Sequence, residues 1–351
     1  MNFVLRPPHL LEAVGLHSSL GFAPRGGRAR VRDVCDDSKM SRVVCFGLLT
    51  LDHQLDVETF PHPNEKVVAL NESVNVGGPA ANAAATAAVL GNSVRLVTAV
   101  GDGAMTNVAH AELRKLGIET IDLRRGQEGA PPISTVLVTV ATGDRAVISK
   151  NAQGVRASVS SEEASEALEG AEVLLVDGHH LSLAVVLAEE AKKKGIFVIF
   201  DGGSWKPGTE DLLPLVDAAV VSSDFRVPPS LLGAGQDTLA YLAHHGCQVV
   251  AQSAGRDPLV GLFEGEPFTV AVDEVTEVVD TLGAGDVLHG ALAHFCALGG
   301  PGELTKERAV YAFERATQLA SFSCQFRGAH GWFKAQAGPG SHRCGPECDL
   351  H

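Results

Sequence analysis

The sequence predicts an α/β protein built in three layers, with a mostly parallel central sheet between two layers of helices. From residue 160 onward, short apolar runs alternate with amphipathic stretches of helical period, which is typical of repeated βαβ units. The apolar runs lack polar alternation, as expected of parallel strands buried on both faces. Glycine turns at 77–78 and 283–285 each precede a helical stretch, and such turns let a ligand approach the backbone.

Composition narrows the classes of function. The 351 residues, 45% of them hydrophobic, suffice for one large domain or two modest ones. The formal net charge of −14 argues against general nucleic-acid binding, although a local glycine turn can hold phosphate even on an acidic protein. No run of about 18 or more apolar residues occurs, so no membrane span is expected. Seven scattered cysteines are typical of a reduced, cytoplasmic protein.

The two ends of the chain differ from the middle. Residues 1–39 hold five arginines and a Pro-Pro pair but no apolar segment typical of a secretory signal. We expect a disordered extension upstream of a start at Met40, with an Arg-rich organelle transit peptide as the alternative. Residues 335–351 are rich in glycine and proline and are also expected to be disordered. A single folded domain is therefore expected over residues 40–334.

The first predicted strand spans residues 43–48, and Asp52 follows it. In doubly wound sheets ligands bind beyond the carboxyl ends of the strands, so Asp52 is a candidate ligand-binding residue. A turn-forming role for Asp52 is the alternative. Residues 53–76 then indicate two exposed strands interrupted by prolines rather than a βαβ unit.

Gly77 and Gly78 precede the next predicted helix, at residues 83–90. A Gly-Gly pair before a helix lets a ligand approach the backbone. Asn82 beside it can both donate a hydrogen bond to a sugar hydroxyl and accept one from it. Such turns are common, so the pair becomes informative only together with a second motif.

The remaining elements follow in order along the chain. We expect strands at 94–100, 173–177, 197–201, 218–222 and 249–251, a hairpin of 134–140 and 145–148 around a turn at 142–144, and helices at 107–116, 181–194, 284–298 and 306–323. Lysines 192–194 would stabilise the negative end of the dipole of helix 181–194. Gly195 is typical of a C-terminal helix cap. Arg145, Lys150 and Asn151 are expected to be solvated strand ends, with ligand-facing roles as the alternative.

The most informative stretch is residues 280–290, Asp-Thr-Leu-Gly-Ala-Gly-Asp-Val-Leu-His-Gly. A β-branched run at 275–279 precedes it and a helical apolar pattern follows, which predicts a strand, a glycine turn and a helix. The free N–H groups of that helix start would hold an anion. Asp286 would lie beside the anion, where a carboxylate is unfavourable unless it takes the proton of an alcohol that attacks a phosphate. An ordinary capping carboxylate is the alternative.

The string from Asp280 to Asp286 resembles the D-T-x-G-A-G-D signature of the ribokinase-like (PfkB) carbohydrate kinases. The earlier residues Gly47, Asp52, Gly77, Gly78 and Asn82 resemble, in order and spacing, the first strand and the G-G-x-x-x-N stretch of that family. The resemblance implies a ribokinase-like fold with a small β-lid over the sugar site, built from about 53–75 and 133–150. Local strings around both motifs look most like the branch of sulfofructose kinase and ketohexokinase.

The resemblance also implies roles for individual residues. Asp286 would be the catalytic base, and the N–H groups of Gly283, Ala284 and Gly285 would form the anion hole. Asp52 and Asn82 would bind sugar hydroxyls next to the Gly77-Gly78 turn. Asp280 is expected to brace the signature turn rather than to touch substrate.

On the nucleotide side the match to the family is looser. Ser253 and Gly255 stand where the family often has T-x-G and would meet the phosphates of ATP. The N-x-x-E motif that the family ties to magnesium and phosphate is absent from residues 221–226, and Asp224 is the candidate substitute. Mg²⁺ would be held largely through the phosphates and water. The need for a monovalent cation is left open.

We therefore predict an ATP-dependent kinase that phosphorylates an alcohol of a sugar, with a ketohexose-like acceptor favoured. A sugar acid or a phosphosugar with an anionic end stands beside it as a first choice, and ribose, a deoxy-ketogluconate and a nucleoside are alternative acceptors. A non-catalytic sugar- or nucleotide-sensing relative is an alternative of another class, as is a dinucleotide-dependent enzyme, although the first βα turn lacks the G-x-G-x-x-G fingerprint. The expected partners are ATP, the sugar and, through the lid, a second copy of the chain, without nucleic acid or membrane.

Overall fold

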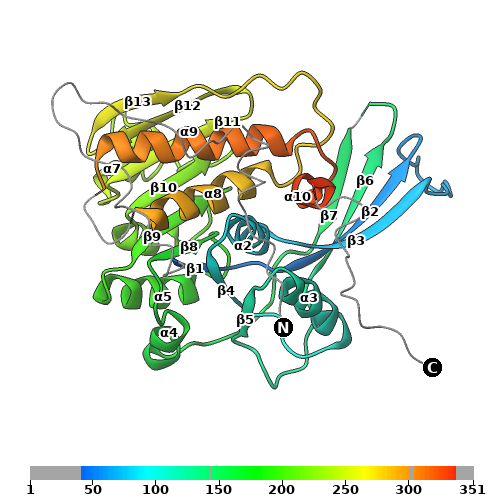
Figure 1. Ribbon diagram of the computed structural model, residues 1–351, viewed down its shortest axis with the longest axis horizontal. Helices are drawn as coiled ribbons and strands as arrows, with labels where there is room; N and C mark the ends of the chain where they lie inside the picture. Colours follow the sequence, from blue (N-terminus) through cyan, green and yellow to red (C-terminus); the bar gives the residue numbers. More distant parts are fainter. Residues whose placement is uncertain (1–40, 143, 300–303, 337–351) are drawn as a thin grey trace, which may run out of the picture.

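The computed structural model describes residues 41–142, 144–299 and 304–336. A nine-stranded sheet forms the centre of the molecule, helices cover both of its faces, and a smaller four-stranded sheet projects from one side (Figure 1). The predicted extension (1–39) lies outside the described residues, as do nearly all of the predicted tail (335–351) and Gly143 of the predicted hairpin turn. No helix in the described part of the chain is long and apolar enough to cross a membrane.

The nine-stranded sheet confirms the predicted α/β architecture. Seven strands are parallel, and two antiparallel strands, β12 and β13, close one edge. Because parallel strands end at one edge, the loops that follow them converge there. The order across the sheet is β13 (Glu266–Val270), β12 (Asp257–Phe263), β11 (Val249–Ala254), β10 (Ala218–Ser222), β9 (Phe197–Gly202), β8 (Val173–Val176), β1 (Arg42–Phe46), β4 (Ser93–Thr98) and β5 (Glu119–Asp122).

Helices pack on the sheet through two separate apolar cores. One core lies under α2, α8 and α9, and the other under α4, α5 and α7. The helices are α2 (Pro79–Val89), α3 (Ala104–Lys115), α4 (Ser161–Ala167), α5 (Leu181–Lys193), α6 (Thr209–Leu212) with the 3₁₀ turn η2 (Leu213–Leu215), α7 (Thr238–His244), α8 (Ala284–Leu298), α9 (Lys306–Ser323) and α10 (Gly331–Gln336). The bounds of α8 and α9 are those predicted from the sequence.

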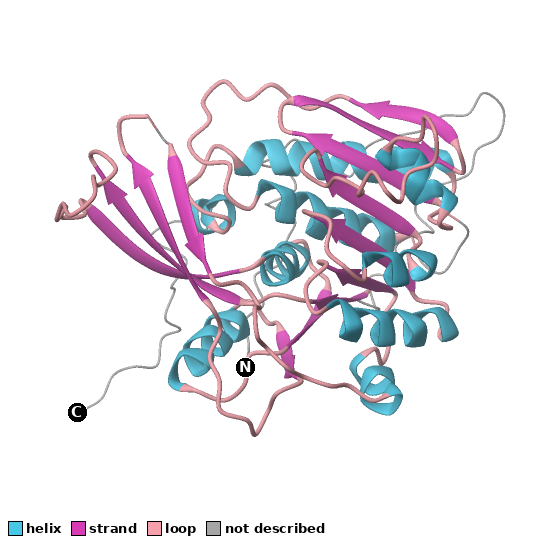
Figure 2. Cartoon of the chain, turned by 180° about the vertical axis from the view of Figure 1, so that it is seen from behind, coloured by secondary structure: helices cyan, strands magenta, loops and turns pink. Residues whose placement is uncertain are grey.

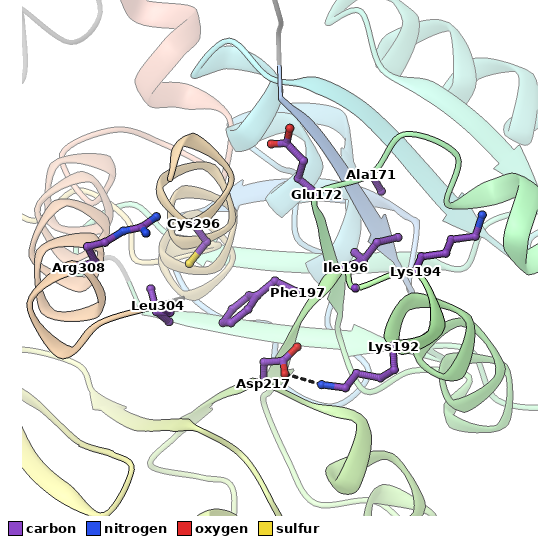
Figure 3. A pocket seen from close by; sticks show the side chains of 11 residues that line it. Ala171, Glu172, Lys192, Lys194, Ile196, Phe197, Asp217, Cys296, Leu304 and Arg308 are labelled. Carbon is purple, nitrogen blue, oxygen red and sulfur yellow. Dashed lines mark hydrogen bonds and ion pairs between the residues drawn. The ribbon is translucent and has the colours of Figure 1, made fainter. Parts of the chain in front are cut away.

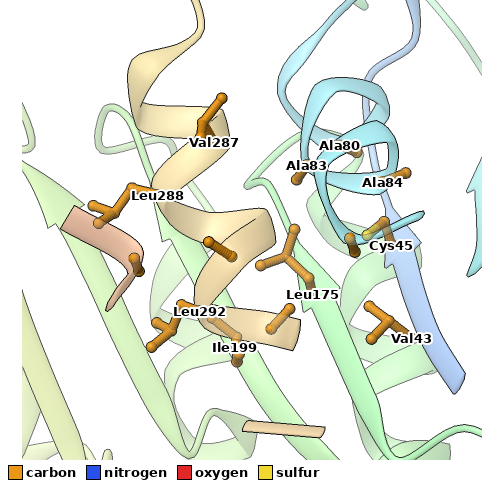
Figure 4. Close-up of a cluster of buried hydrophobic side chains, with 14 of the residues drawn as sticks. Val43, Cys45, Ala80, Ala83, Ala84, Leu175, Ile199, Val287, Leu288 and Leu292 are labelled. Carbon is orange, nitrogen blue, oxygen red and sulfur yellow. The ribbon is translucent and has the colours of Figure 1, made fainter. Parts of the chain in front are cut away.

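Helices α2 and α8 approach each other closely over the sheet. A β-carbon on Gly290 of α8 would lie 2.4 Å from the carbonyl oxygen of Ala83 in α2, so only glycine permits this crossing. Figure 4 shows Val287 of α8 and the small alanines of α2 above strand residues such as Leu175, with Leu288 on the opposite side of α8. This packing places the N-termini of the two motif-bearing helices side by side.

The four-stranded sheet has the order β3 (Asn71–Gly77), β2 (Thr50–Val57), β6 (Ile133–Thr139) and β7 (Arg145–Ser149). Strands β2 and β6 are parallel and the other neighbours are antiparallel. The sheet stands away from the helices of the central layers (Figure 2). Several of its apolar side chains are exposed, among them Val74, Ile133, Val147 and Ile148.

The strand predicted at 275–279 is wrong. Residues 271–283 form an irregular connection, and Val278 and Val279 are 57% and 41% exposed. The reason is topological: β13 is the edge of the sheet, so the chain must cross back toward α2 before α8 can begin. The N–H groups of Val279 and Asp280 instead donate to the carbonyl of Cys324.

Candidate active site

The two glycine motifs meet in one contact between α2 and α8. Asn82 Nδ2 donates a hydrogen bond of 2.7 Å to Asp286 Oδ2, across 204 residues of sequence. Asn82 is 4% exposed, and its Oδ1 accepts no hydrogen bond from the part of the chain that the structure describes. A buried acceptor of this kind needs a donor, and a sugar hydroxyl would supply one. The pair therefore has the geometry of a base with an adjoining hydroxyl-binding amide.

The carboxyl group of Asp286 is poised to accept a proton near neutral pH. Burial and the negative charge of Asp201 raise the pKa of Asp286 to about 7, against the opposing effect of the Asn82 hydrogen bond. Burial also raises the pKa of Asp201 to about 8. His289 lies one helical turn after Asp286, with its Nδ1 3.4 Å from Asp201 Oδ2. A carboxylate tuned toward neutral pH in this way is typical of a general base.

The signature turn before α8 is braced by Asp280, as expected. The Asp280 carboxylate accepts the N–H groups of Leu282 and Gly328, each at 2.9 Å. Arg145 of β7 donates to Asp280 Oδ1 at 3.2 Å and to Thr281 Oγ1 at 3.0 Å. Arg145 is exposed, as expected of a solvated strand end, but its side chain also ties the four-stranded sheet to the signature turn.

Gly283 occupies a backbone position that only glycine fits well. Its φ is 77°, and a β-carbon there would lie 2.4 Å from the β-carbon of Ala329. Gly285, in contrast, is helical, and a β-carbon on it would meet nothing within 4 Å. The N–H groups of Gly283, Ala284 and Gly285 were predicted to form the anion hole. In the structure the N–H of Ala284 already donates to the Thr281 carbonyl at 3.3 Å.

Asp52 lies inside β2 rather than in a loop directly after β1. Its Oδ1 accepts the hydroxyl of Thr50 at 2.8 Å, and burial raises its pKa. A β-carbon on Gly77 would lie 2.0 Å from Asp52 Oδ2, so this glycine makes room for the carboxylate. Gly78, with φ 95°, caps α2, and a β-carbon there would lie 2.4 Å from the Leu48 carbonyl.

A small pocket of about 130 Å³ connects Asp52 with the signature turn. Asp52 and Asn75 line it from the four-stranded sheet, and Leu282 and Gly328 line it from the signature side. Two contacts join the end of the chain to the same sheet: Arg327 pairs with Asp56, and Lys334 Nζ donates to Asn75 Oδ1 at 3.0 Å. Asp52 thus faces the same region as the signature, although no direct bond links it to Asp286.

Asp177 at the end of β8 is a site residue that the sequence analysis missed. It is 2% exposed and accepts the N–H groups of Leu48 at 2.7 Å and of Ala80 at 3.1 Å. A β-carbon on Gly47 would lie 2.0 Å from Asp177 Oδ1, which explains the glycine that ends β1. The carboxylate thereby fixes the first turn of α2, which carries Asn82. The available signal was a polar residue that ends an otherwise apolar strand.

The residues predicted for the nucleotide lie at the same edge of the sheet. Ser253 pairs in register with Ser222 at the ends of β11 and β10, and Gly255, with φ 62°, turns the chain into β12. Asp224 is exposed just after β10, and its N–H donates to Ser222 Oγ at 3.1 Å. Within the described residues no three His, Cys, Asp or Glu side chains lie close enough to hold a metal ion. Asp224 could offer magnesium a single carboxylate, with phosphates supplying other ligands.

A cavity of about 480 Å³ lies at the opposite edge of the sheet and is lined by none of the predicted site residues (Figure 3). Glu172, Phe197 and Asp217 line it at the amino ends of β8, β9 and β10. Lys192 Nζ donates to Asp217 Oδ1 at 2.6 Å, so one of its cations is already paired. Ligands of open α/β sheets bind at the carboxyl edge, so this cavity is not the candidate active site.

Comparisons with known proteins show the family of the chain. A model of the pfkB family of carbohydrate kinases matches residues 40–332. The ribokinase of Haemophilus influenzae is 23% identical over 173 residues, which cover 49% of this chain and 56% of that enzyme. The ribokinase of Arabidopsis thaliana is 24% identical over 270 residues, 73% of this chain and 71% of that enzyme. The structure of Arabidopsis ribokinase complexed with ribose and ATP superposes with a TM-score of 0.66 at 22% identity, covering 83% of this chain and 94% of that one.

Proposed function

Since the chain belongs to the pfkB family of carbohydrate kinases, we propose that Asp286 is the general base of an ATP-dependent transfer of phosphate to a sugar alcohol. The observation that carries this proposal is the 2.7 Å hydrogen bond between Asn82 and Asp286. It joins a hydroxyl-binding amide to a proton acceptor at the N-terminus of a helix. Phosphoryl transfer depends mainly on such alignment and on charge stabilisation.

The residues divide the work of the reaction between them. Asn82 and Asp52 bind hydroxyls of the acceptor, and Asp286 takes the proton of the hydroxyl that attacks the γ-phosphorus. The N–H groups of the Gly283–Gly285 turn, of which that of Ala284 also donates to the Thr281 carbonyl, meet the negative charge that develops on the transferred phosphoryl group. Ser253 and Gly255 face the nucleotide phosphates. Asp224 is the proposed protein ligand of Mg²⁺, whose charge would offset that of the phosphates when it is bound.

The four-stranded sheet is proposed to act as a lid. Its β7 is tied to the signature turn through the ion pair of Arg145 with Asp280, and its β2 carries Asp52. A lid that closes on these contacts would exclude water, so that ATP is not simply hydrolysed. The exposed apolar residues of the sheet, such as Val147 and Ile148, also support a homodimer formed through the lid.

The acceptor proposed first is a ketohexose or a derivative of one. Support comes from the strings around Gly78 and Asp286, which look most like those of sulfofructose kinase and ketohexokinase. Relatives of this chain are named ribokinase and deoxyribokinase, so pentoses belong in the same test. A sugar acid and a nucleoside are the remaining acceptors. A non-catalytic sensor is the alternative function, favoured only by the missing N-x-x-E motif.

Release of ADP from Mg-ATP, measured across a panel of acceptors, tests this function. The panel contains fructose, ribose, 2-keto-3-deoxygluconate, fructose 6-phosphate, sulfofructose, inositol and adenosine. We expect release that depends on one of the ketohexose-like acceptors. Binding of ATP without release on any acceptor would favour the sensor, and a preference for adenosine would overturn the sugar assignment.

The raised pKa of Asp286 predicts how activity depends on pH. The base must be deprotonated, so kcat/KM for the acceptor should fall about tenfold per pH unit below a pKa of about 7 and level off above it. Replacing Asn82 by leucine removes a hydrogen bond that lowers this pKa, so the acid limb should move to higher pH. Initial rates from pH 5.5 to 8.5 measure both profiles. A flat profile in this range would exclude Asp286 as the titrating base.

A further inference from the structure

A cavity of about 550 Å³ lies beside the candidate active site. It is lined by residues 151–153 after β7, by residues 178–182 between β8 and α5, and by residues 206–208 after β9. All three segments lie near the edge of the sheet where Asp286 is found. The cavity therefore lies near the active site but is built from different residues.

Asp177 connects the cavity with the active site. His179 lines the cavity, and its Nδ1 lies 3.1 Å from Asp177 Oδ1. The other carboxylate oxygen of Asp177 accepts the N–H of Ala80, in the helical turn that carries Asn82. A molecule with its hydroxyl at Asn82 and Asp286 would need to extend past Asp177 to reach the cavity.

Lys206 is a half-buried cation that lines this cavity. Its backbone is held by Thr209, whose hydroxyl donates to the Lys206 carbonyl at 2.7 Å. The Lys206 side chain makes no hydrogen bond or ion pair within the described ranges of the chain, although its charge acts on nearby Asp201 and His179. An incoming anion would give this half-buried cation a direct partner and so stabilise it. Asp211, which also lines the cavity, is exposed.

His179 lines the cavity together with Lys206. Burial lowers its pKa, but the neighbouring charge of Asp177 outweighs burial and raises the pKa of His179 above its ordinary value. His180 and Asn151, which flank it, both adopt left-handed backbone conformations, with φ of 53° and 51°. Such conformations are unfavourable for residues with a β-carbon and often occur at ligand sites.

We propose that this cavity is the subsite for an anionic group of the acceptor, a phosphate or a carboxylate, which binds Lys206 and His179. The kinase would then prefer phosphosugars or sugar acids to neutral sugars of the same skeleton. This inference rests on the proposed function, because the hydroxyl of the same molecule would lie at Asp286. The γ-phosphate of ATP is the other anionic group that would fit Lys206 and His179. The experiment must therefore distinguish the γ-phosphate from an anionic group of the acceptor.

Replacement of Lys206 by methionine tests the subsite. The matched control is Lys194→Met, which removes an exposed lysine at the other end of α5. In the wild type, kcat/KM for fructose 6-phosphate or 2-keto-3-deoxygluconate should exceed that for fructose by about tenfold or more, since charge-assisted hydrogen bonds are strong. Lys206→Met should abolish this advantage while KM for ATP stays unchanged. Lys194→Met should behave as the wild type.

Three outcomes would overturn the proposal. The first is that kcat/KM of the wild type is the same for fructose as for both anionic acceptors. The second is that Lys206→Met leaves the preference for the anionic acceptors intact. The third is that this variant raises KM for ATP alone, which would assign Lys206 to the γ-phosphate. If no acceptor is phosphorylated, the proposed kinase specificity is wrong. Calorimetric titration with fructose, fructose 6-phosphate and 2-keto-3-deoxygluconate then tests the subsite separately. Tighter binding of an anionic sugar that is lost in Lys206→Met would support the subsite, and equal binding of all three would reject it.

Discussion

Replacing Asp286 by asparagine is expected to lower turnover by about a hundredfold or more while the fold and ATP binding are kept. Asparagine has the same shape and can still accept the hydrogen bond that Asn82 donates at 2.7 Å. It cannot take a proton from the attacking hydroxyl. Because Asp286 lies near the like charge of Asp201, the loss of its charge should leave the melting temperature unchanged or raise it.

The measurement is ADP release at saturating Mg-ATP and acceptor, together with thermal unfolding and nucleotide titration of the same samples. Asp273→Asn is the matched control, since this exposed carboxylate lies in the connection before the signature turn. We expect normal turnover for the control. If Asp286→Asn turned over at a rate near that of the wild type, Asp286 would not be the base. If it lost ATP binding or unfolded, its role would be structural.

Most of the architecture could be predicted because its signals are local. Helical periodicity predicted the bounds of α8 and α9 to the residue, and continuous apolar runs predicted the parallel strands other than β5. The prediction failed at residues 275–279, where β-branched residues indicate a strand but the topology requires a crossing. The short α4 was also missed, although Ser160 and Glu163 form a capping box that marks its start.

The candidate site was predictable only in part, because its contacts join distant segments. Glycine turns and the carboxylate of the signature can be read from the sequence, and they identified Asn82 and Asp286. Nothing in the sequence indicated that these two side chains touch, that Asp177 fixes α2, or that Arg145 reaches Asp280. Each of these contacts follows from the order of strands in space, which a single sequence does not contain.

Alanine at Gly283 and alanine at Gly285 should both impair catalysis but have opposite effects on stability. At Gly283 a left-handed φ of 77° costs about 1–2 kcal/mol for a residue with a β-carbon. The same β-carbon would lie 2.4 Å from that of Ala329, which forces the turn away from the C-terminal segment. Gly283→Ala should therefore lower the melting temperature and displace Asp286, with turnover reduced by about a hundredfold.

Gly285 is the control that separates stability from catalysis. Its added methyl group meets no protein atom within 4 Å, and alanine is favoured over glycine in a helix by up to about 1 kcal/mol, so Gly285→Ala should keep or raise the melting temperature. If the transferred phosphoryl group approaches this backbone, the methyl group will occupy its path and reduce kcat/KM for ATP by about tenfold or more. Thermal unfolding and ATP kinetics of both variants measure the contrast. A stable Gly285→Ala enzyme with unchanged ATP kinetics would place the phosphate elsewhere, and the anion-hole assignment of this turn would have to be abandoned.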